Sequence, residues 1–417
     1  MLDIIPRRSV NFSPGVFFTA LRIIRDKQVY RGPEIESFKE KFANYIGLKY
    51  ITGVSLARAG FYLLLKALDL KPGDEIIMPA YNFHVLPIIA KVLGIKPVFV
   101  DITSETYNID VTLIEKNITP KTKAILVIHM SGLPCAMEPI LDIAHKNNLK
   151  VIEDCAQALG AEYKGRKVGS WGDVSIFSFD FNKNMPCFLG GIVATNDITV
   201  YRKLVELFVE YSSFDRRNFW RNLFSNFIFY FAMKKQIFPF TTYPIIRILD
   251  SFNSDFVDKL THSEIYLPTC MPRHYKMRLT NLQAAVGLKQ MEALDSVNQR
   301  MINNAEVLNR ELAGIEGIRI PRSLPGYKHI YLYYRLIVGK PYAFRKKLLR
   351  RGVDILRSCM LACSELEFFS DAKANCPVAI KAANNGLEIP NGPSLTEENM
   401  LYIARQIRQV NAQLRKR

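Results

Sequence analysis

Apolar and polar positions follow a regular order along the first half of the chain. From residue 34 to about residue 200, stretches with helical spacing of their apolar residues, such as PEIESFKEKFANYIG and AGFYLLLKALDL, alternate with short apolar runs. Five runs have the length and composition of buried strands: DEIIMP, KPVFVDI, KAILVIH, LKVIED and DVSIFSF. This alternation predicts an α/β fold with a mostly parallel central sheet and helices on both faces.

The alternation breaks between about residues 201 and 265. Roughly a third of the aromatic residues of the chain lie between Phe208 and Phe256. Within this stretch, the run LFSNFIFYFAM is too short to span a bilayer. It is flanked by cations, as is typical of segments lying in a membrane interface: Arg216, Arg217, Arg221, Lys234 and Lys235. Two interpretations stay open: a membrane contact through residues 216–247, and a subdomain packed on the body of the protein or at a dimer interface.

A second half of different character follows the aromatic stretch. The run LTNLQAAVGLKQMEALDSVNQRMINNAEVLNREL predicts a long helix, and a smaller α+β region comes after it. We therefore expect a large domain over residues 1–270, which includes the insertion at about 201–265. A connecting long helix over 271–315 and a small C-terminal domain over 316–417 complete the predicted organisation.

Composition and charge narrow the class of partner. The 417 residues are 49% hydrophobic and 23% charged, as in ordinary globular proteins, yet the formal net charge is +17. The basic residues are scattered, and no helix-turn-helix, zinc-finger or RNA-recognition signature is present, so we expect no nucleic-acid partner. Anionic ligands such as phosphates, or an anionic membrane surface, remain as explanations of the positive charge.

Cysteine and histidine usage favours a reducing compartment and no metal. The seven cysteines are odd in number and lack CxxC spacing, which predicts buried thiols. The first residues show no long apolar run followed by a cleavage site. We expect a cytoplasmic protein, with the inner face of the cytoplasmic membrane as the place that the aromatic stretch would favour. The six histidines form no ligand cluster, so no metal is predicted.

Chemically useful residues follow the predicted strands, and ligands of parallel sheets bind at the carboxyl ends of strands. Asp154 closes one strand, and Gln157 follows three residues later. Ser178 ends another strand, and Lys183 lies in the next loop. Two further candidates are a helix start at Ala57-Arg58 and the MPAYNFH segment with Phe83.

The order and spacing of these motifs resemble the DegT/DnrJ/EryC1/StrS family, the pyridoxal-phosphate sugar aminotransferases of aspartate-aminotransferase fold type I. The resemblance covers nearly the whole chain. It rests on VYRGPEIESFKEKFANYIGLKY, LKPGDEIIMPAYNF, GIKPVFVDITSETYNID, IHMSGLPCAMEPI, VIEDCAQALGAEYKGRKVGSWGDVSIFSF, RLTNLQAAVGLKQME and LEIPNGPSLTEENMLYIARQI.

The resemblance implies a role for each matching residue around the cofactor ring. Lys183 falls at the position of the lysine that forms the Schiff base with pyridoxal phosphate and later carries a proton. Asp154 would face the pyridine nitrogen and keep it protonated. Gln157 would hydrogen-bond the ring hydroxyl, and Phe83 would stack on the ring.

The phosphate side of the implied site departs from the family pattern. Ser178 would hold the phosphate together with backbone N–H groups around Ala57 and Arg58, where the family usually has Gly-Thr. Lys276 stands where the family has an asparagine that reaches the phosphate from the neighbouring subunit. Both changes introduce a cation and keep anion binding. After the lysine, the usual threonine-threonine-glycine-glutamate stretch is the apolar run 186–189.

The function implied by this resemblance is amino transfer from an amino acid, by family analogy glutamate, to a keto-sugar. The sugar would be nucleotide- or lipid-linked and would serve cell-surface polysaccharide, glycolipid or amino-sugar biosynthesis, and the protein would be a homodimer with shared active sites. Two alternatives stay open. One is a sugar dehydratase, which Lys183 disfavours because that branch of the family has histidine there, and the other is a non-catalytic, membrane-associated regulatory or scaffold protein.

Overall fold

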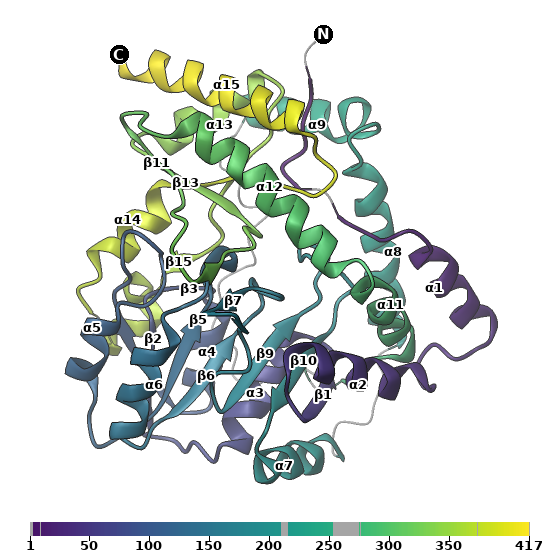
Figure 1. The fold of residues 1–417 in the computed structure, drawn as a ribbon, viewed down its shortest axis with the longest axis vertical. Coiled ribbons are helices and arrows are strands. Elements are labelled where there is room, and N and C mark those ends of the chain that lie inside the picture. Colours follow the sequence, from purple (N-terminus) through teal and green to yellow (C-terminus); the bar gives the residue numbers. More distant parts are fainter. Residues whose placement is uncertain are drawn as a thin grey trace.

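A seven-stranded sheet lies at the centre of the computed structural model, which describes residues 3–8, 10–209, 216–252, 275, 277–372 and 374–416 (Figure 1). The strand order is β1-β10-β9-β6-β5-β2-β4, and only β10 runs antiparallel to its neighbours. The strands are β1 (Tyr50–Val54), β2 (Glu75–Pro79), β4 (Lys96–Val100), β5 (Thr122–Ile128), β6 (Lys150–Asp154), β9 (Val174–Ser178) and β10 (Gly191–Thr195). The predicted mostly parallel sheet is confirmed.

Helices cover both faces of this sheet because both sides of its strands are apolar. In β2, Ile76 and Met78 join the core on one face, while Ile77 joins the core on the other. The first face is covered by α3 (Ala57–Ala67), α4 (Val85–Val92) and α7 (Ile198–Val209). The second is covered by α2 (Glu34–Ile46), α5 (Val111–Ile114), α6 (Met137–Lys146) and α11 (Asn281–Met291).

A smaller α+β unit follows, as the sequence predicts. Its antiparallel sheet has the order β11-β13-β16-β14. The elements of this unit are β11 (Ile318–Arg319), β13 (Tyr334–Val338), β14 (Leu356–Arg357), β16 (Gly386–Ile389), α13 (Pro341–Arg350), α14 (Pro377–Asn385) and α15 (Glu397–Arg415). Both ends of the chain lie near α15, at the top of Figure 1.

Short elements connect these units. Two small sheets join distant parts of the chain: β3 (Tyr81–Asn82) with β15 (Leu361–Ala362), and β7 (Glu162–Tyr163) with β8 (Arg166–Lys167) and β12 (Tyr327–Lys328). Short 3₁₀ helices are η1 (Glu115–Asn117), η2 (Met130–Gly132), η5 (Cys363–Glu365) and η6 (Glu367–Ala372), and the last is interrupted at Phe369. The pairing of β3 with β15 brings the small unit over the carboxyl end of the large sheet.

The predicted long connecting helix is two helices. α11 starts with a capping box at Thr280 and ends at Met291, and α12 (Leu294–Leu312) begins after a short break. The two helices pack on different partners, α11 on α1 (Val16–Arg25) and α2, and α12 on α15. A single straight helix cannot serve both sets of contacts, which accounts for the break.

The aromatic insertion begins later than the sequence suggests. Residues 201–209 belong to α7, which packs against α3 and the sheet. The described part of the insertion consists of α8 (Arg216–Ala232), η3 (Phe238–Phe240) and α9 (Thr242–Phe252). In the part of the chain that the structure describes, we find no helix with the length and hydropathy needed to cross a bilayer.

Candidate active site

The predicted site residues converge on one cavity. Its volume is about 610 Å³, and it lies where the carboxyl ends of the central strands meet the small unit. Seven of the eight predicted residues line it: Ala57, Arg58, Phe83, Asp154, Gln157, Ser178 and Lys183. The eighth, Lys276, lies outside the described residues.

Strand register explains why residues distant in sequence meet here. Asp154 is the last residue of β6 and Ser178 the last residue of β9, and these two strands are parallel neighbours. Lys183 follows in the loop between β9 and β10, where its backbone N–H donates to the Asp180 carbonyl at 2.9 Å. Parallel pairing therefore places the carboxylate, the hydroxyl and the amine at one edge of the sheet.

The Asp154 carboxylate is buried at the floor of the cavity. Burial raises its pKa, and this effect exceeds the opposing influences of the Ala156 N–H, Lys183 and His129. The Ala156 N–H donates to Oδ1 at 2.9 Å and fixes the orientation of the carboxylate. A buried acid whose charge is disfavoured gains most from a cationic partner, and a protonated pyridine nitrogen is such a partner.

The Lys183 amine is also buried, and burial by itself lowers its pKa. Tyr333, Asp180 and Asp154 outweigh that effect, so the pKa of Lys183 is raised overall. Its Nζ lies 5.8 Å from the centre of the Tyr333 ring. The amine is held among acidic groups and an aromatic face within the same cavity as Asp154.

Gln157 and Phe83 occupy fixed positions beside this pair. The Gln157 Oε1 accepts the Ser131 N–H at 2.9 Å, and its Nε2 approaches the Met360 sulfur at 3.6 Å. The orientation of the Gln157 amide is therefore set by two contacts. The Phe83 ring lines the cavity, and the Arg58 guanidinium lies 5.7 Å from its centre.

The start of helix α3 also borders the cavity. α3 begins at Ala57, and Leu56 at its N-cap makes no side-chain hydrogen bond to the first N–H groups. Gly191 of β10 allows the close approach of this helix start, because a Cβ on Gly191 would lie 2.8 Å from the Ala57 nitrogen. Leu56, Arg58 and Ser178 line the same region. Uncapped amides, a guanidinium and a hydroxyl together suit a phosphate group, so the described residues fit pyridoxal phosphate from ring nitrogen to phosphate.

Several cavity residues were not predicted from the sequence. Tyr333 and Arg8 are the clearest examples. The Arg8 guanidinium lies 5.0 Å from the centre of the Tyr333 ring and 2.7 Å from the Glu388 carboxylate. Four more come from the aromatic insertion: Phe229, Met233, Thr242 and Ile246. The paired arginines near the N-terminus and the tyrosine-rich run 331–334 were the available signals, but nothing in their spacing relates them to one site.

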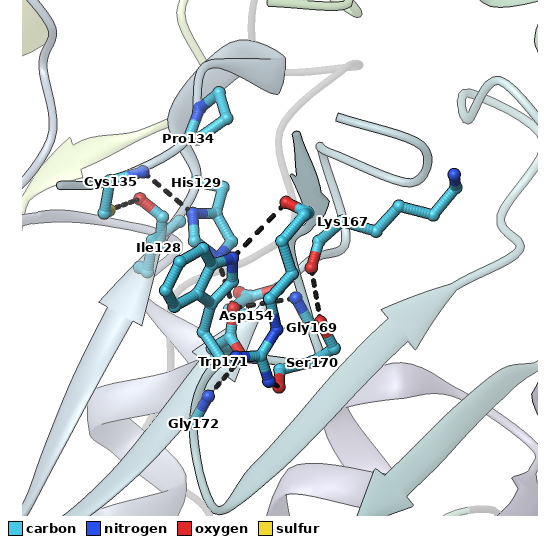
Figure 2. A network of polar contacts seen from close by, with 12 residues as sticks. Ile128, His129, Pro134, Cys135, Asp154, Lys167, Gly169, Ser170, Trp171 and Gly172 are labelled. Carbon is cyan, nitrogen blue, oxygen red and sulfur yellow. Dashed lines mark hydrogen bonds and ion pairs between the residues drawn. The ribbon is translucent and has the colours of Figure 1, made fainter. Parts of the chain in front are cut away.

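A buried polar network supports the strand that carries Asp154. The neighbouring Glu153 accepts the N–H groups of Gly169, Trp171 and Gly172 at 2.7, 2.8 and 2.6 Å. His129 Nδ1 accepts the Cys135 N–H, which leaves His129 Nε2 to donate to Glu153 at 3.0 Å (Figure 2).

The same network contains the one described group with the spacing of metal ligands, His129, Glu153 and Cys155. Both Glu153 oxygens already accept two hydrogen bonds each, and both His129 nitrogens are engaged. The Glu153 carboxylate and the His129 ring are therefore engaged in hydrogen bonds that fix the backbone beside the cavity.

Comparison with known proteins identifies the family. The profile of the DegT/DnrJ/EryC1/StrS aminotransferase family matches residues 18–238 and 241–408. The chain belongs to this family. The predicted fold type and enzyme class are thereby confirmed, and pyridoxal phosphate is the cofactor of this aminotransferase.

Named relatives within the DegT/DnrJ/EryC1/StrS family agree with the predicted function. The GDP-perosamine synthase of Escherichia coli is 30% identical over 380 residues, which cover 90% of each chain. The dTDP-3-amino-3,4,6-trideoxy-alpha-D-glucose transaminase of Streptomyces venezuelae is 27% identical and covers 93% of this chain and 90% of its own length. Both relatives are enzymes of amino-sugar synthesis.

Solved structures of the same kind share the fold. DesV of Streptomyces venezuelae, solved with a ketimine intermediate, has a TM-score of 0.73 and 26% identity, covering 94% of this chain and 93% of its own. The aminotransferase of Psychrobacter cryohalolentis has a TM-score of 0.79 and 25% identity, covering 98% and 100%.

The apolar loop after Lys183, which departs from the DegT/DnrJ/EryC1/StrS pattern, is part of the core. Cys187 and Phe188 are buried, and the Phe188 ring lies 4.9 Å from that of Phe12. Gln283 and Gln290 donate to the backbone carbonyls of Phe188 and Pro186, each at 3.1 Å. Side chains from α11 and the N-terminal segment thus hold this loop in place.

Proposed function

We propose that this aminotransferase moves an amino group from an amino acid, glutamate by analogy with the family, to the keto group of a sugar. The sugar would be carried on a nucleotide or a lipid, and its product would enter cell-surface polysaccharide, glycolipid or other amino-sugar synthesis. The observation that carries the proposal is the single cavity shared by Lys183, Asp154, Gln157 and Ser178. The amino-sugar enzymes among its relatives support it.

Asp154 and Lys183 would divide the acid–base work. Pyridoxal phosphate, when bound, supplies an electron sink for the electrons of a breaking C–H bond. The Asp154 carboxylate would hold a proton on the pyridine nitrogen, and the cationic ring would offset the cost of burying the carboxylate charge. Lys183 would anchor the cofactor, and its Nζ, once released, would carry the proton taken from the amino-acid α-carbon.

The remaining predicted residues would bind and orient. Gln157 would direct its amide N–H to the ring hydroxyl, since its oxygen is already engaged by Ser131. Phe83 would stack on the ring, and Ser178, Arg58 and the Ala57 N–H would hold the phosphate. These contacts fix the ring relative to Lys183, which the proton transfer requires.

Replacing Lys183 tests this assignment. Lys183→Ala and Lys183→Arg should both abolish the visible absorbance of covalently bound cofactor and reduce amine transfer by at least about 100-fold, because neither side chain can act as the nucleophile. The wild-type absorbance should be lost on addition of glutamate.

Lys203→Ala, at an exposed lysine that pairs with Asp69, should retain both signals. A visible band that persists in Lys183→Ala, or a wild-type protein whose band glutamate leaves unchanged, contradicts the proposal. Release of a dehydrated sugar without amine transfer would instead favour the dehydratase alternative.

We also propose a homodimer in which the partner completes the phosphate site, and a contact of residues 216–247 with the inner face of the cytoplasmic membrane. The first rests on the position of Lys276 in the family pattern. The second rests on the aromatic and basic composition of the insertion.

A further inference from the structure

α8 is apolar on two opposite sides, which is unusual for a surface helix. On its inner side, Phe229 lines the active-site cavity, as does Met233 directly after the end of the helix. On its outer side, Phe224 is 66% exposed and Ile228 is 52% exposed. Three further aromatic residues on that outer side are also exposed: Trp220, Phe227 and Phe231. Positions 220, 224, 227 and 231 follow helical spacing, so they form one continuous stripe.

The exposed stripe continues onto α1. The Phe17 ring contacts the Phe227 ring at 5.5 Å and the Phe231 ring at 6.3 Å. Beside these contacts, α1 exposes 81% of Phe18 and 64% of Leu21. We call these exposed side chains of α1 and α8 the docking face: Phe18, Leu21, Trp220, Phe224, Phe227, Ile228 and Phe231. Contiguous aromatic surface of this kind marks an interaction site on a globular protein.

The neighbouring helix adds apolar surface of the same character. In η3, Phe240 is 84% exposed, and on α9 the residues Ile245, Ile248 and Phe252 are exposed with i, i+3, i+7 spacing. The opposite side of α9 is anchored, since Tyr243 donates to the Leu349 carbonyl at 2.7 Å. The insertion therefore presents apolar side chains while its other side is fixed to the protein.

Cations lie at both ends of α8, and one of them, Lys235, is paired with Asp3 at 3.1 Å. Arg217 and Arg221 lie on the exposed side at the start of α8, and Lys234 and Lys235 follow its end. The one acidic residue between 216 and 252 is Asp250, which is buried and paired with Arg345. An apolar stripe with positive charge at both ends matches acyl chains beneath anionic headgroups.

The same charges disfavour a second copy of the chain as the occupant. In a two-fold interface a patch meets itself, so the cationic ends of one α8 would face those of the other. No acidic side chain of α8 or α9 is exposed to compensate them. Like charges brought together in this way oppose association.

We propose that the docking face binds the surface of an anionic phospholipid membrane, with its aromatic side chains among the lipid chains and Arg217 and Arg221 at the headgroups. The inference deepens the membrane contact proposed above. Vesicle binding needs neither substrate nor catalysis, so it can fail while amine transfer succeeds, and the reverse also holds.

Vesicle flotation with the cofactor-loaded, full-length protein tests this inference. Wild type should float with phosphatidylglycerol vesicles and at least about tenfold less with phosphatidylcholine vesicles, and molar salt should weaken the binding. Phe224→Ser/Ile228→Ser should lose the flotation. Arg217→Gln/Arg221→Gln should need a larger fraction of phosphatidylglycerol for the same binding.

Val205→Ser, an exposed apolar residue on α7 outside the face, should float like wild type. Retained cofactor absorbance reports that each variant is folded. Absence of wild-type flotation on phosphatidylglycerol overturns the proposal, as does unchanged flotation of Phe224→Ser/Ile228→Ser. A fall in molar mass of that variant by light scattering, without lipid, identifies the face as a subunit interface and also overturns it.

Discussion

The buried carboxylate of Asp154 links cofactor binding to stability. Burial raises its pKa in the folded, cofactor-free protein, so the folded state binds more protons than the unfolded state between the two pKa values. The free energy of unfolding therefore falls as pH rises from the unfolded pKa, about 3.9, through the folded pKa. A cation placed against Asp154 would stabilise its charged form and so recover the free energy of unfolding that is lost at higher pH.

We expect Asp154→Asn to raise the free energy of unfolding of the cofactor-free protein at neutral pH and to leave it nearly unchanged below about pH 4, where aspartate is protonated in both states. Urea unfolding across this pH range measures the effect. Turnover should fall on the order of 100-fold, because the pyridine nitrogen loses its carboxylate partner.

Asp197→Asn is the control, because its effect on the free energy of unfolding at neutral pH should have the opposite sign. The pKa of Asp197 is lowered, since the Thr199 and Val200 N–H groups outweigh the effect of burial on its carboxylate. Its removal should reduce stability at neutral pH and leave turnover intact. Equal pH dependence of wild type and Asp154→Asn would contradict the argument for Asp154.

Glu153 stabilises the strand beside the catalytic cavity. Glu153→Gln places an amide NH₂ among the N–H groups of Gly169, Trp171 and Gly172, so at least one donor loses its acceptor (Figure 2). We expect a loss of roughly 3 kcal/mol in the free energy of unfolding. Glu162→Gln, in a partly exposed pair with Lys328, should cost less than about 1 kcal/mol in the same urea titration.

Residues at strand ends could be predicted from sequence, and residues brought in by tertiary packing could not. Asp154 and Ser178 follow apolar runs, so parallel pairing alone brings them together. Arg8 reaches the cavity through Glu388, 380 positions away, and the spacing of neither residue reveals that contact. The assigned roles of these residues at the cofactor remain predictions.

At the scale of elements, a buried ion pair joins α9 to α13, beside the hydrogen bond from Tyr243 to the Leu349 carbonyl. Asp250 pairs with Arg345, and both side chains are almost completely buried. The basic run over residues 340–357 is thus more than a solvated face, because one of its arginines anchors the insertion.

Asp250→Asn should lower the free energy of unfolding by roughly 3 kcal/mol, because it removes the carboxylate that compensates a buried guanidinium. Proteolysis within residues 216–252 should accelerate, and urea unfolding measures the stability change. Lys235→Gln, in a partly exposed pair with Asp3, should change neither by much, since such pairs contribute less than about 1 kcal/mol. Unchanged proteolysis in Asp250→Asn would show that α9 does not depend on this pair.

Helices and strands could be predicted where a single spacing of apolar residues runs along the whole element. Each of the five predicted strand runs forms a strand of the central sheet, since both faces of each strand are apolar. The division between α11 and α12 was not predictable, because apolar spacing continues across it while the packing partners change. Likewise, residues 201–209 share the aromatic character of the insertion but belong to α7. The predicted domain boundaries stay a prediction.

At the scale of the whole molecule, the cavity is assembled from four distant parts of the chain. The large sheet supplies Asp154 and Ser178, the N-terminal segment supplies Arg8, the small unit supplies Tyr333, and the insertion supplies Phe229. Bridges between these parts include the Arg7–Asp354 ion pair at 2.6 Å and the pairing of β3 with β15. The chemistry of one edge of the sheet therefore depends on packing throughout the chain.

Because α8 borders the cavity with Phe229 and faces outward with Phe224, it is a boundary common to two binding events. Thermodynamic linkage makes any coupling through such a boundary reciprocal. If contact of α8 with an external surface changes the affinity of the cavity for its ligand by some factor, then binding of the ligand changes the affinity of the protein for that surface by the same factor. A shift of this one helix on contact with a surface would therefore move Phe229 and change the shape of the cavity.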